Sequence, residues 1–397
     1  MVISAATLQA TGGAVDIESM GERSLRGISE PVSVYELKGI RPAIASQQFR
    51  GGQKLSPFVG RGREFAGLAQ AMNEARAGRS PVVGVVGEAG TGKSRLVFQF
   101  LESCRASGIP ILEARATGYG RATPLRPVLD LLRTFFGIDR ETSKEAATER
   151  VRGALHRHNL SSDLPLLLDF LGLPLPGGSE APPSDAALRH LKLLDALRRL
   201  IRAVALAQSS VLVVEDLHWL DTASEPFLEV LADTIAGTTS LMLVNFRKDY
   251  ATGWMKRPYY RQTALQPLDA DSIQAMLDHA LGEDSSLAHL RHQIIARAGG
   301  NPFFAEELVR SSIEQEILTG TTGDFRATAA GRDASLPATI EAVLGSRIDR
   351  LPENDKLFLQ AASVVGKEFP LSVGAQVAHI TVEQARRSAQ RLLGAEM

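Results

Sequence analysis

Three uninterrupted apolar runs dominate the pattern of hydrophobic and polar positions along this chain. They cover residues 81–86, 211–214 and 241–244. Runs without polar alternation are typical of parallel strands that are buried on both faces. Residues 95–104, which follow the first run after a glycine-rich segment, have apolar side chains at helical spacing. The sequence therefore predicts an α/β fold through about residue 250, in which helices flank a parallel sheet.

Downstream of this core the pattern becomes helical. After Pro267 the candidate helices are residues 271–281, 287–298 and 302–318, and residues 319–335 are expected to form a loop or a weak hairpin. Within the core, residues 172–185 are rich in Pro and Gly and predict a surface loop. A helix after this loop is expected to pack into the core through Leu188, Leu191, Leu194, Leu197, Ile201 and Val204.

The C-terminal part has a further helical pattern that begins at Pro337. One face carries Ile340, Leu344, Ile348 and Leu351, and residues 357–365 and 381–393 are two more candidate helices. The stretch between these two candidates does not favour any one structure.

A glycine-rich segment follows the first apolar run and opens the first helix. Its sequence GEAGTGKS has the spacing of a phosphate-binding loop, and strand and helix stand on the correct sides. Successive backbone N–H groups of such a loop surround an anion, and the helix dipole adds to the attraction. Lys93 is expected at the β- and γ-phosphates and Ser94 at a Mg²⁺ ion. The predicted ATP-binding residues are Gly87, Glu88, Ala89, Gly90, Thr91, Gly92, Lys93 and Ser94.

Two acidic residues follow the second apolar run. Glu215 and Asp216 would emerge at the carboxyl end of a core strand, where open α/β sheets bind their ligands. Glu215 is expected to hold the Mg²⁺ shell together with Ser94. Asp216 is expected to orient or deprotonate the attacking water. An ordinary acidic strand end is the alternative.

These segments, together with ARAGGNPFFAEEL at residues 296–308, resemble the ATPase module of the signal-transduction NTPases called STAND. That family is related to the AAA and Orc/Cdc6 ATPases. The resemblance implies that Val59, Gly60 and Arg61 lie beside the adenine. It also implies that Pro302 packs on the nucleotide and that Arg247 senses the γ-phosphate. Without the resemblance, Arg247 is a surface residue at a strand end, and Gly-Asn-Pro only starts a helix.

The resemblance also has departures. Many AAA relatives have Glu where this chain has Asp216, which is one methylene shorter, so slow ATP hydrolysis is expected. The favoured function is a nucleotide-gated regulatory ATPase. The alternative is a DNA-binding ATPase or regulator of the Orc/Cdc6 or LuxR kind, for which Arg386, Arg387 and Arg391 are the candidate contacts.

The first forty residues resemble the C-terminal tail of a class III adenylate/guanylate cyclase domain. Residues 21–28 and 30–32 carry the resemblance, and residues 31–37 predict a strand by their alternation. The cyclase's metal-binding aspartates and its Asn and Arg at the transition state belong to earlier parts of that domain, so no cyclase activity is expected from this chain. The chain is expected to be part of a longer cyclase–ATPase fusion.

These patterns predict five regions. They are a cyclase-like tail (residues 1–40), a linker (41–56), the ATPase core (57–260), a helical lid (261–335) and an incomplete winged-helix-like region (336–397).

Composition adds limits on partners and location. The net charge is −1, so the chain as a whole does not have the positive charge typical of nucleic-acid-binding proteins. A local basic patch is the remaining way to bind nucleic acid. A single cysteine, Cys104, excludes a disulfide within the chain. With neither a signal peptide nor a membrane-spanning run, the cytoplasm is the expected location. Protein partners, an upstream cyclase domain and nucleotide-dependent oligomers are the expected associations.

Overall fold

The structure is a computed structural model that describes residues 2–4, 15–23, 32–40, 57–116, 124–139, 141–175, 183–328, 336–366 and 369–394. Backbone contacts divide the chain into two units. One comprises residues 58–336, and the other comprises residues 1–57 and 337–397. The linker predicted over residues 41–56 lies outside the described residues.

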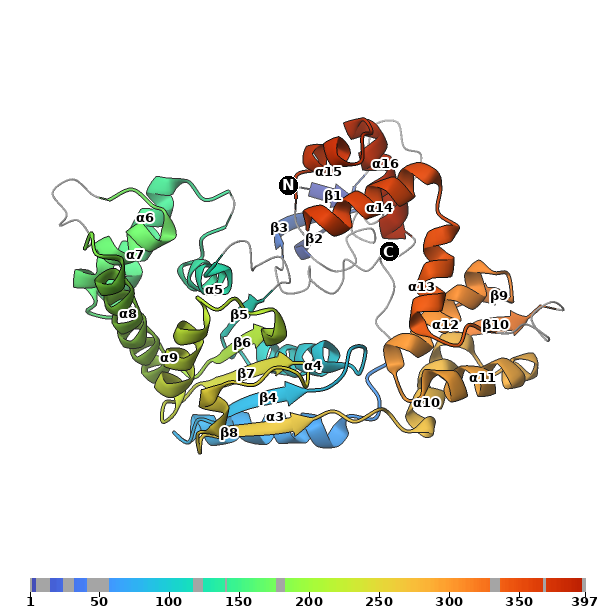
Figure 1. The fold of residues 1–397 in the computed structure, drawn as a ribbon, viewed down its shortest axis with the longest axis horizontal. Helices are drawn as coiled ribbons and strands as arrows, with labels where there is room; N and C mark the ends of the chain where they lie inside the picture. The colour runs from blue at the N-terminus through green and yellow to red at the C-terminus, as the bar shows by residue number, and fades with distance from the viewer. Residues whose placement is uncertain are drawn as a thin grey trace. The chain divides into compact units, whose positions relative to one another are not determined.

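A five-stranded parallel sheet forms the centre of the larger unit (Figure 1). Its strands lie in the order β5-β6-β7-β4-β8, so that β4, which precedes the phosphate loop, is separated from the acidic strand β6 by β7. The strands are β4 (Val82–Val86), β5 (Ile111–Arg115), β6 (Val211–Glu215), β7 (Leu241–Phe246) and β8 (Tyr260–Ala264). The predicted fold class is confirmed. Because β8 belongs to the sheet, the core extends past the boundary predicted at residue 260.

Both faces of the three central strands, β4, β6 and β7, are buried, as their unbroken apolar runs predicted. Odd-numbered residues such as Val83 and Val213 pack against α3 (Gly62–Arg76) and α4 (Lys93–Ala106). Even-numbered residues such as Val214 and Val244 pack against α9 (Glu225–Ile235) and the fully buried Trp254. The alternation follows from the two-residue period of a strand.

A group of helices is inserted between β5 and β6, at the β5 side of the sheet (Figure 1). It has its own core, which includes Phe136, Leu155, Leu168 and Leu197. Its helices are α5 (Arg126–Phe136), α6 (Lys144–Arg157), α7 (Leu164–Leu171) and α8 (Ala186–Ala207).

The first turns of α8 correct one expectation. Leu188 and Leu191 were predicted to pack into the core, but 46% and 63% of their surfaces are exposed. The buried side of α8 begins only at Leu193, because the first two turns extend past the side chains of the helical core. Residues 176–182 of the predicted surface loop lie outside the described residues.

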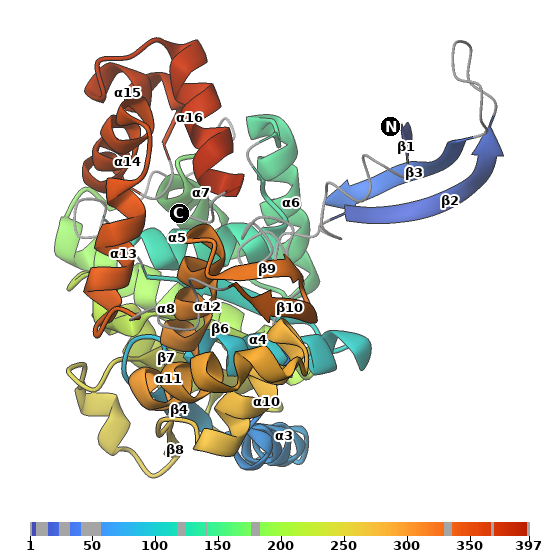
Figure 2. The same cartoon turned by 90° about the vertical axis from the view of Figure 1, so that its right-hand side faces the viewer.

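The lid follows β8 and contains the three predicted helices. They are α10 (Ala270–Leu281), α11 (Ala288–Ala298) and α12 (Pro302–Glu314), which ends before the predicted Leu318. A hairpin of β9 (Leu318–Thr321) and β10 (Asp324–Ala327) follows and packs against α10, which agrees with the hairpin alternative (Figure 2). Residues 329–335 lie outside the described residues.

The N-terminal strands form a separate antiparallel sheet in the order β1-β3-β2 (Figure 2). Its members are β1 (Val2–Ser4), β2 (Val15–Arg23) and β3 (Val32–Ile40), and β3 confirms the strand predicted from alternation. The pairing of β2 with β3 has register shifts after Asp16 and Ser19, and in Figure 2 the two strands form a bent ribbon.

The C-terminal helices are α13 (Ile340–Asp349), α14 (Glu353–Val365), α15 (Leu371–Val377) and α16 (Val382–Gly394). The predicted helices within residues 357–365 and 381–393 are confirmed, and α15 occupies the stretch that had no prediction. Within the described part of this region no strand is present, so the winged helix stays a prediction.

An ion pair between the half-exposed Arg391 and the buried Asp355 ties α14 to α16. The Arg391 guanidinium donates from Nε to Asp355 Oδ2 at 2.7 Å and from Nη2 to Oδ1 at 2.5 Å. Arg391 is therefore engaged within the helical bundle, which removes it from the arginines available for DNA.

Of the helices that the structure describes, none is both long and apolar enough to cross a membrane.

Candidate nucleotide-binding site

The phosphate loop connects β4 to α4, as the sequence predicts. Gly90 and Gly92 adopt φ angles of +77° and +92°, a region in which a side chain would be strained. A Cβ atom at Gly87 would lie 2.7 Å from Thr91 Oγ1, so that position requires glycine for space. Helix α4 begins at Lys93 directly after the loop, with Ser94 in its first turn. Backbone N–H groups at this helix start are positioned to bind an anion.

Lys93 lies buried inside the loop. Its Nζ donates to the carbonyl oxygens of Gly87 and Glu88, both at 2.9 Å. Burial lowers the pKa of the Lys93 ammonium, the carboxylate of Asp216 opposes this effect, and the Arg247 guanidinium lowers the pKa further. The interaction with Asp216 shows that the loop lysine and the acidic strand end belong to one electrostatic site.

The two acids at the end of β6 share an arginine. Arg115, the last residue of β5, has its Nη2 atom 3.1 Å from Glu215 Oε2 and its Nε atom 3.2 Å from Asp216 Oδ2. Parallel pairing sets this arrangement, because Arg115 is in register with Glu215. The sequence analysis did not identify Arg115.

On the other side of the acids, the fully buried Asn245 of β7 bridges them. Its Nδ2 donates to Glu215 Oε2 at 3.1 Å, and its Oδ1 accepts from the backbone N–H of Asp216 at 2.8 Å. Asp216 has a φ angle of +61°, an unusual conformation for a residue other than glycine. The hydrogen bond that the Asp216 N–H donates to Asn245 Oδ1 holds the Asp216 backbone in this conformation.

Arg247 directly follows β7 and contacts Trp219, whereas Asn245 contacts both acids. The Arg247 guanidinium carbon is 5.8 Å from the centre of the Trp219 ring. Its charge acts on Lys93 and also lowers the pKa of His218, for which burial is the main cause. The sensing role predicted for Arg247 stays a prediction.

The segment before α3 lies at the junction of core and lid. A Cβ atom at Gly60 would be 2.4 Å from Ser272 Oγ of α10, so the backbone of this segment lies close against the lid. The buried Arg61 donates from Nη2 to the carbonyl oxygen of Thr91 at 3.0 Å and to that of Gln266 at 2.6 Å. Val59 precedes it and is half-buried. The adenine site predicted here stays a prediction.

The Gly-Asn-Pro segment of the lid lies on the phosphate loop. A Cβ atom at Gly92 would have Pro302 Cγ as its nearest neighbour, at 3.9 Å. Asn301 caps α12 by accepting from the backbone N–H of Phe304 at 3.2 Å. The same side chain donates from Nδ2 to the carbonyl oxygen of Ala89 at 3.1 Å. The structure thus brings Pro302 to the loop and adds Asn301, which the sequence analysis did not single out.

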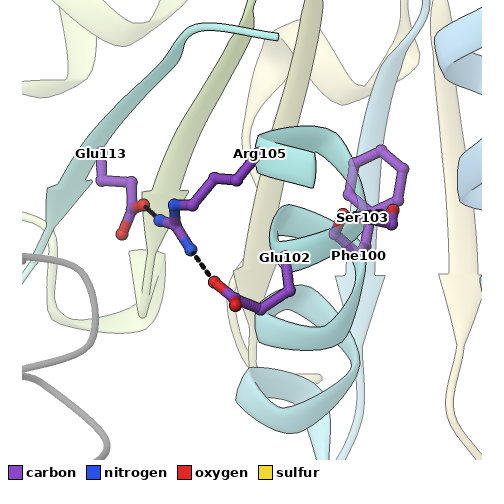
Figure 3. Close-up of polar contacts among 5 residues, drawn as sticks. All are labelled: Phe100, Glu102, Ser103, Arg105 and Glu113. Atoms are coloured by element: carbon purple, nitrogen blue, oxygen red, sulfur yellow. Dashed lines mark hydrogen bonds and ion pairs between the residues drawn. The ribbon is translucent and has the colours of Figure 1, made fainter. Parts of the chain in front are cut away.

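A second arginine links α4 to β5 away from the acids. Arg105 lies between Glu102 of its own helix, at 2.7 Å, and Glu113 of β5 (Figure 3). Burial raises the pKa of the Glu113 carboxyl, and Arg105 opposes the effect. Because Glu113 and Arg115 point to the same side of β5, this ion pair supports the strand that presents Arg115.

Residues 57–244 match the family model of the AAA ATPase domain. The matched segment includes the phosphate loop, Arg115 and both acids, and it ends one residue before Asn245. Strand β8 and the lid lie outside it. The match therefore covers the predicted site residues from Val59 to Asp216, and Arg247 and Pro302 lie beyond it.

Known proteins similar to this chain include three at sequence identities of 25% or less. An uncharacterized protein of Rhizobium meliloti (strain 1021) is 25% identical over 378 residues, which cover 94% of this chain and 36% of that protein. A signal transduction ATPase with numerous domains (STAND), with a tetratricopeptide repeat sensor, from Pyrococcus horikoshii is 13% identical with a TM-score of 0.44, over 86% of this chain and 40% of that one. AMPPCP-bound DnaA from Aquifex aeolicus is 10% identical with a TM-score of 0.35, over 85% and 90% of the two chains.

Proposed function

We propose that residues 58–336 bind ATP with Mg²⁺, hydrolyse it slowly, and act as the regulatory module of a signal-transduction protein. The single observation that carries this proposal is the complete phosphate loop between β4 and α4, in which the Nζ of Lys93 is held at 2.9 Å by the carbonyl oxygens of Gly87 and Glu88. The match of residues 57–244 to an ATPase domain supports it.

The arrangement suits binding of the phosphate groups. Lys93 is held inside the loop by two carbonyl oxygens, Gly87 O and Glu88 O, and would exchange these contacts for phosphate oxygens. Among the described residues no cluster of three acidic, His or Cys side chains could hold a metal ion. A Mg²⁺ ion would therefore be held by Ser94, Glu215 and the phosphates together, and it would neutralise phosphate charge. Arg115 and Asn245 both contact Glu215 Oε2 and would hold the Glu215 side chain in place beside the ion.

Slow hydrolysis follows from the surroundings of Asp216. Its carboxylate would accept the proton of the attacking water, but Arg115 pairs with it. The Arg115 guanidinium therefore competes with the attacking water for the Asp216 carboxylate. Asp216 is also shorter than the glutamate of many AAA relatives. Both features favour a module that holds ATP for long periods.

The link to a cyclase is the finer part of the proposal. The antiparallel strands β1–β3 support the resemblance of residues 1–40 to a cyclase tail, and the tail would connect a cyclase domain to its ATPase regulator. Catalysis of cyclisation requires carboxylates that hold two metal ions. We expect purified chain incubated with ATP and Mn²⁺ to give no cyclic AMP or cyclic GMP. Product above a protein-free blank would contradict this expectation.

The test of the main proposal combines two measurements on the purified chain. Calorimetric titration should give a saturable Mg·ATP site, and phosphate release should be slow but dependent on Asp216. Absence of any ATP or ADP binding would overturn the proposal. The alternative is a DNA-binding ATPase, for which Arg386 and Arg387 are the exposed candidate contacts, whereas Arg391 is paired with Asp355.

A further inference from the structure

The phosphate loop is held from its outer side. Asn301 Nδ2 donates to the Ala89 carbonyl at 3.1 Å, and Arg61 Nη2 donates to the Thr91 carbonyl at 3.0 Å. Between them, the backbone N–H of Phe303 donates to the Gly90 carbonyl at the longer distance of 3.4 Å. Three consecutive carbonyl groups of the loop are therefore each engaged by a group outside it.

These contacts fix the direction of N–H groups as well as carbonyls. A trans peptide is planar, and its C=O and N–H point in opposite directions. Holding the Ala89 carbonyl outward therefore turns the N–H of Gly90 inward, and holding the Thr91 carbonyl does the same for Gly92. The N–H of Thr91 closes a turn on the Glu88 carbonyl at 3.4 Å and is not part of this set.

The loop needs such support because of its composition. Gly90 and Gly92 have no side chains, and glycine samples more backbone conformations than any other residue. An unsupported loop would lose this freedom when phosphate binds, and the loss would weaken binding. Contacts that fix the glycine peptides beforehand remove that loss.

We propose that Asn301 and Arg61 are positioning residues that orient the N–H groups of Gly90 and Gly92 for phosphate. The inference rests on the proposed function and adds a way in which the lid regulates phosphate binding. Asn301 belongs to the lid, and Arg61 also holds Gln266, which lies between β8 and the first lid helix. Docking of the lid and binding of phosphate therefore strengthen each other by the same factor, since coupling between two equilibria is reciprocal.

The test uses Asn301→Ser in the full chain. A serine hydroxyl still caps α12 but is too short to reach the Ala89 carbonyl. The probe is tripolyphosphate, because it lacks base and sugar and so does not report a displaced adenine site; ADP is titrated in parallel. We expect both affinities to fall about three- to tenfold, the value of one hydrogen bond.

A matched control separates this effect from a weakened lid. Asp284 accepts from the backbone N–H of Ser286 at 2.9 Å and pairs with Arg326 at 3.4 Å, so its contacts stay within the lid. Asp284→Ala removes a lid cap without touching the loop, and its affinity for tripolyphosphate should equal that of the wild type.

A second variant keeps the inference falsifiable if Asn301→Ser fails to fold. Arg61→Lys retains the charge but has a single donor group in place of the guanidinium, and it should also weaken tripolyphosphate binding. Unchanged affinity in both variants, or an equal loss in Asp284→Ala, would overturn this inference and leave ATP binding intact. A wild-type chain that binds neither tripolyphosphate nor ADP would overturn the proposed function and this inference together.

Discussion

The phosphate loop and the acidic end of β6 belong to one site but are stabilised in different ways. The loop is supported by the lid and by the segment before α3, through Asn301 and Arg61. The acids are supported within the sheet, by Arg115 of β5 and Asn245 of β7. Phosphate binding should therefore respond to the position of the lid, whereas the chemical step should respond to the neighbouring strands. A module built in this way can change its affinity without rearranging its acids.

The largest effect should come from the acid itself. Asp216→Asn keeps the shape of the side chain but cannot accept a proton, so hydrolysis should fall about 100- to 10,000-fold while ATP binding stays. Single-turnover phosphate release measures this. Asp249→Asn, in an exposed residue, is the control and should hydrolyse ATP at the wild-type rate. Hydrolysis by Asp216→Asn at the wild-type rate would move the catalytic role to Glu215.

Substitution of the loop lysine, Lys93, should weaken ATP binding, which Asp216→Asn leaves intact. Lys93→Ala removes a buried charge-assisted contact to the phosphates, and the affinity for ATP should fall about 30- to 150-fold, or about 2–3 kcal/mol. Lys248→Ala is the matched control, because Lys248 pairs with Glu88 of the loop at 3.1 Å but is solvent-exposed. Equal calorimetric affinities for both variants and the wild type would contradict the assignment of the loop.

Asn245 tests whether the sheet alone supports the acids. Asn245→Ala would leave the partly buried N–H of Asp216 without its partner, which should cost about 1 kcal/mol of folding stability. Hydrolysis should fall, and ADP affinity should stay near that of the wild type. Chemical denaturation and an ADP titration measure the two quantities. A loss of ADP affinity as large as that of Lys93→Ala would show that the phosphate loop and the acidic end of β6 do not act independently.

The smallest effect should come from Arg115, and its sign is informative. Arg115→Gln releases Asp216 from its ion pair, so phosphate release should accelerate about two- to fivefold, the size expected for a partly exposed pair. Arg105→Gln provides the control, because Arg105 pairs with Glu113 of β5 and not with the acids at the end of β6. A slower reaction in Arg115→Gln would indicate that the arginine assists the chemical step.

Sequence patterns identified the centre of the sheet but not its edges. Strands β4, β6 and β7 are buried on both faces, and their apolar runs were sufficient to predict them. The edge strands β5 and β8 have the sequences ILEAR and YRQTA, in which charged and polar residues break the pattern. Missing β5 meant missing Arg115, although an arginine at the end of a short apolar segment is a detectable signal.

The sequence was also a limited guide to which residues at the ends of the predicted elements contact the acids and the loop. The strand before Arg247 was predicted, and the arginine was chosen for its charge. Asn245, which lies two residues earlier and within β7, is the residue that contacts both acids, through Glu215 Oε2 and the backbone N–H of Asp216. Asn301 was treated only as part of a helix start. Its contact with Ala89 joins residues 212 positions apart, which local patterns do not encode.

The hinge after β8 has a mechanical consequence. The N–H of Leu265 donates to the Val86 carbonyl at 2.7 Å, so the last ladder bond before the lid lies directly beside the first residue of the phosphate loop. A force applied to the chain beyond the lid would travel through residues 265–268 and would load this bond and the Arg61 contact before the rest of the sheet. The segment that joins the lid to the sheet is therefore also the segment through which tension would reach the phosphate loop.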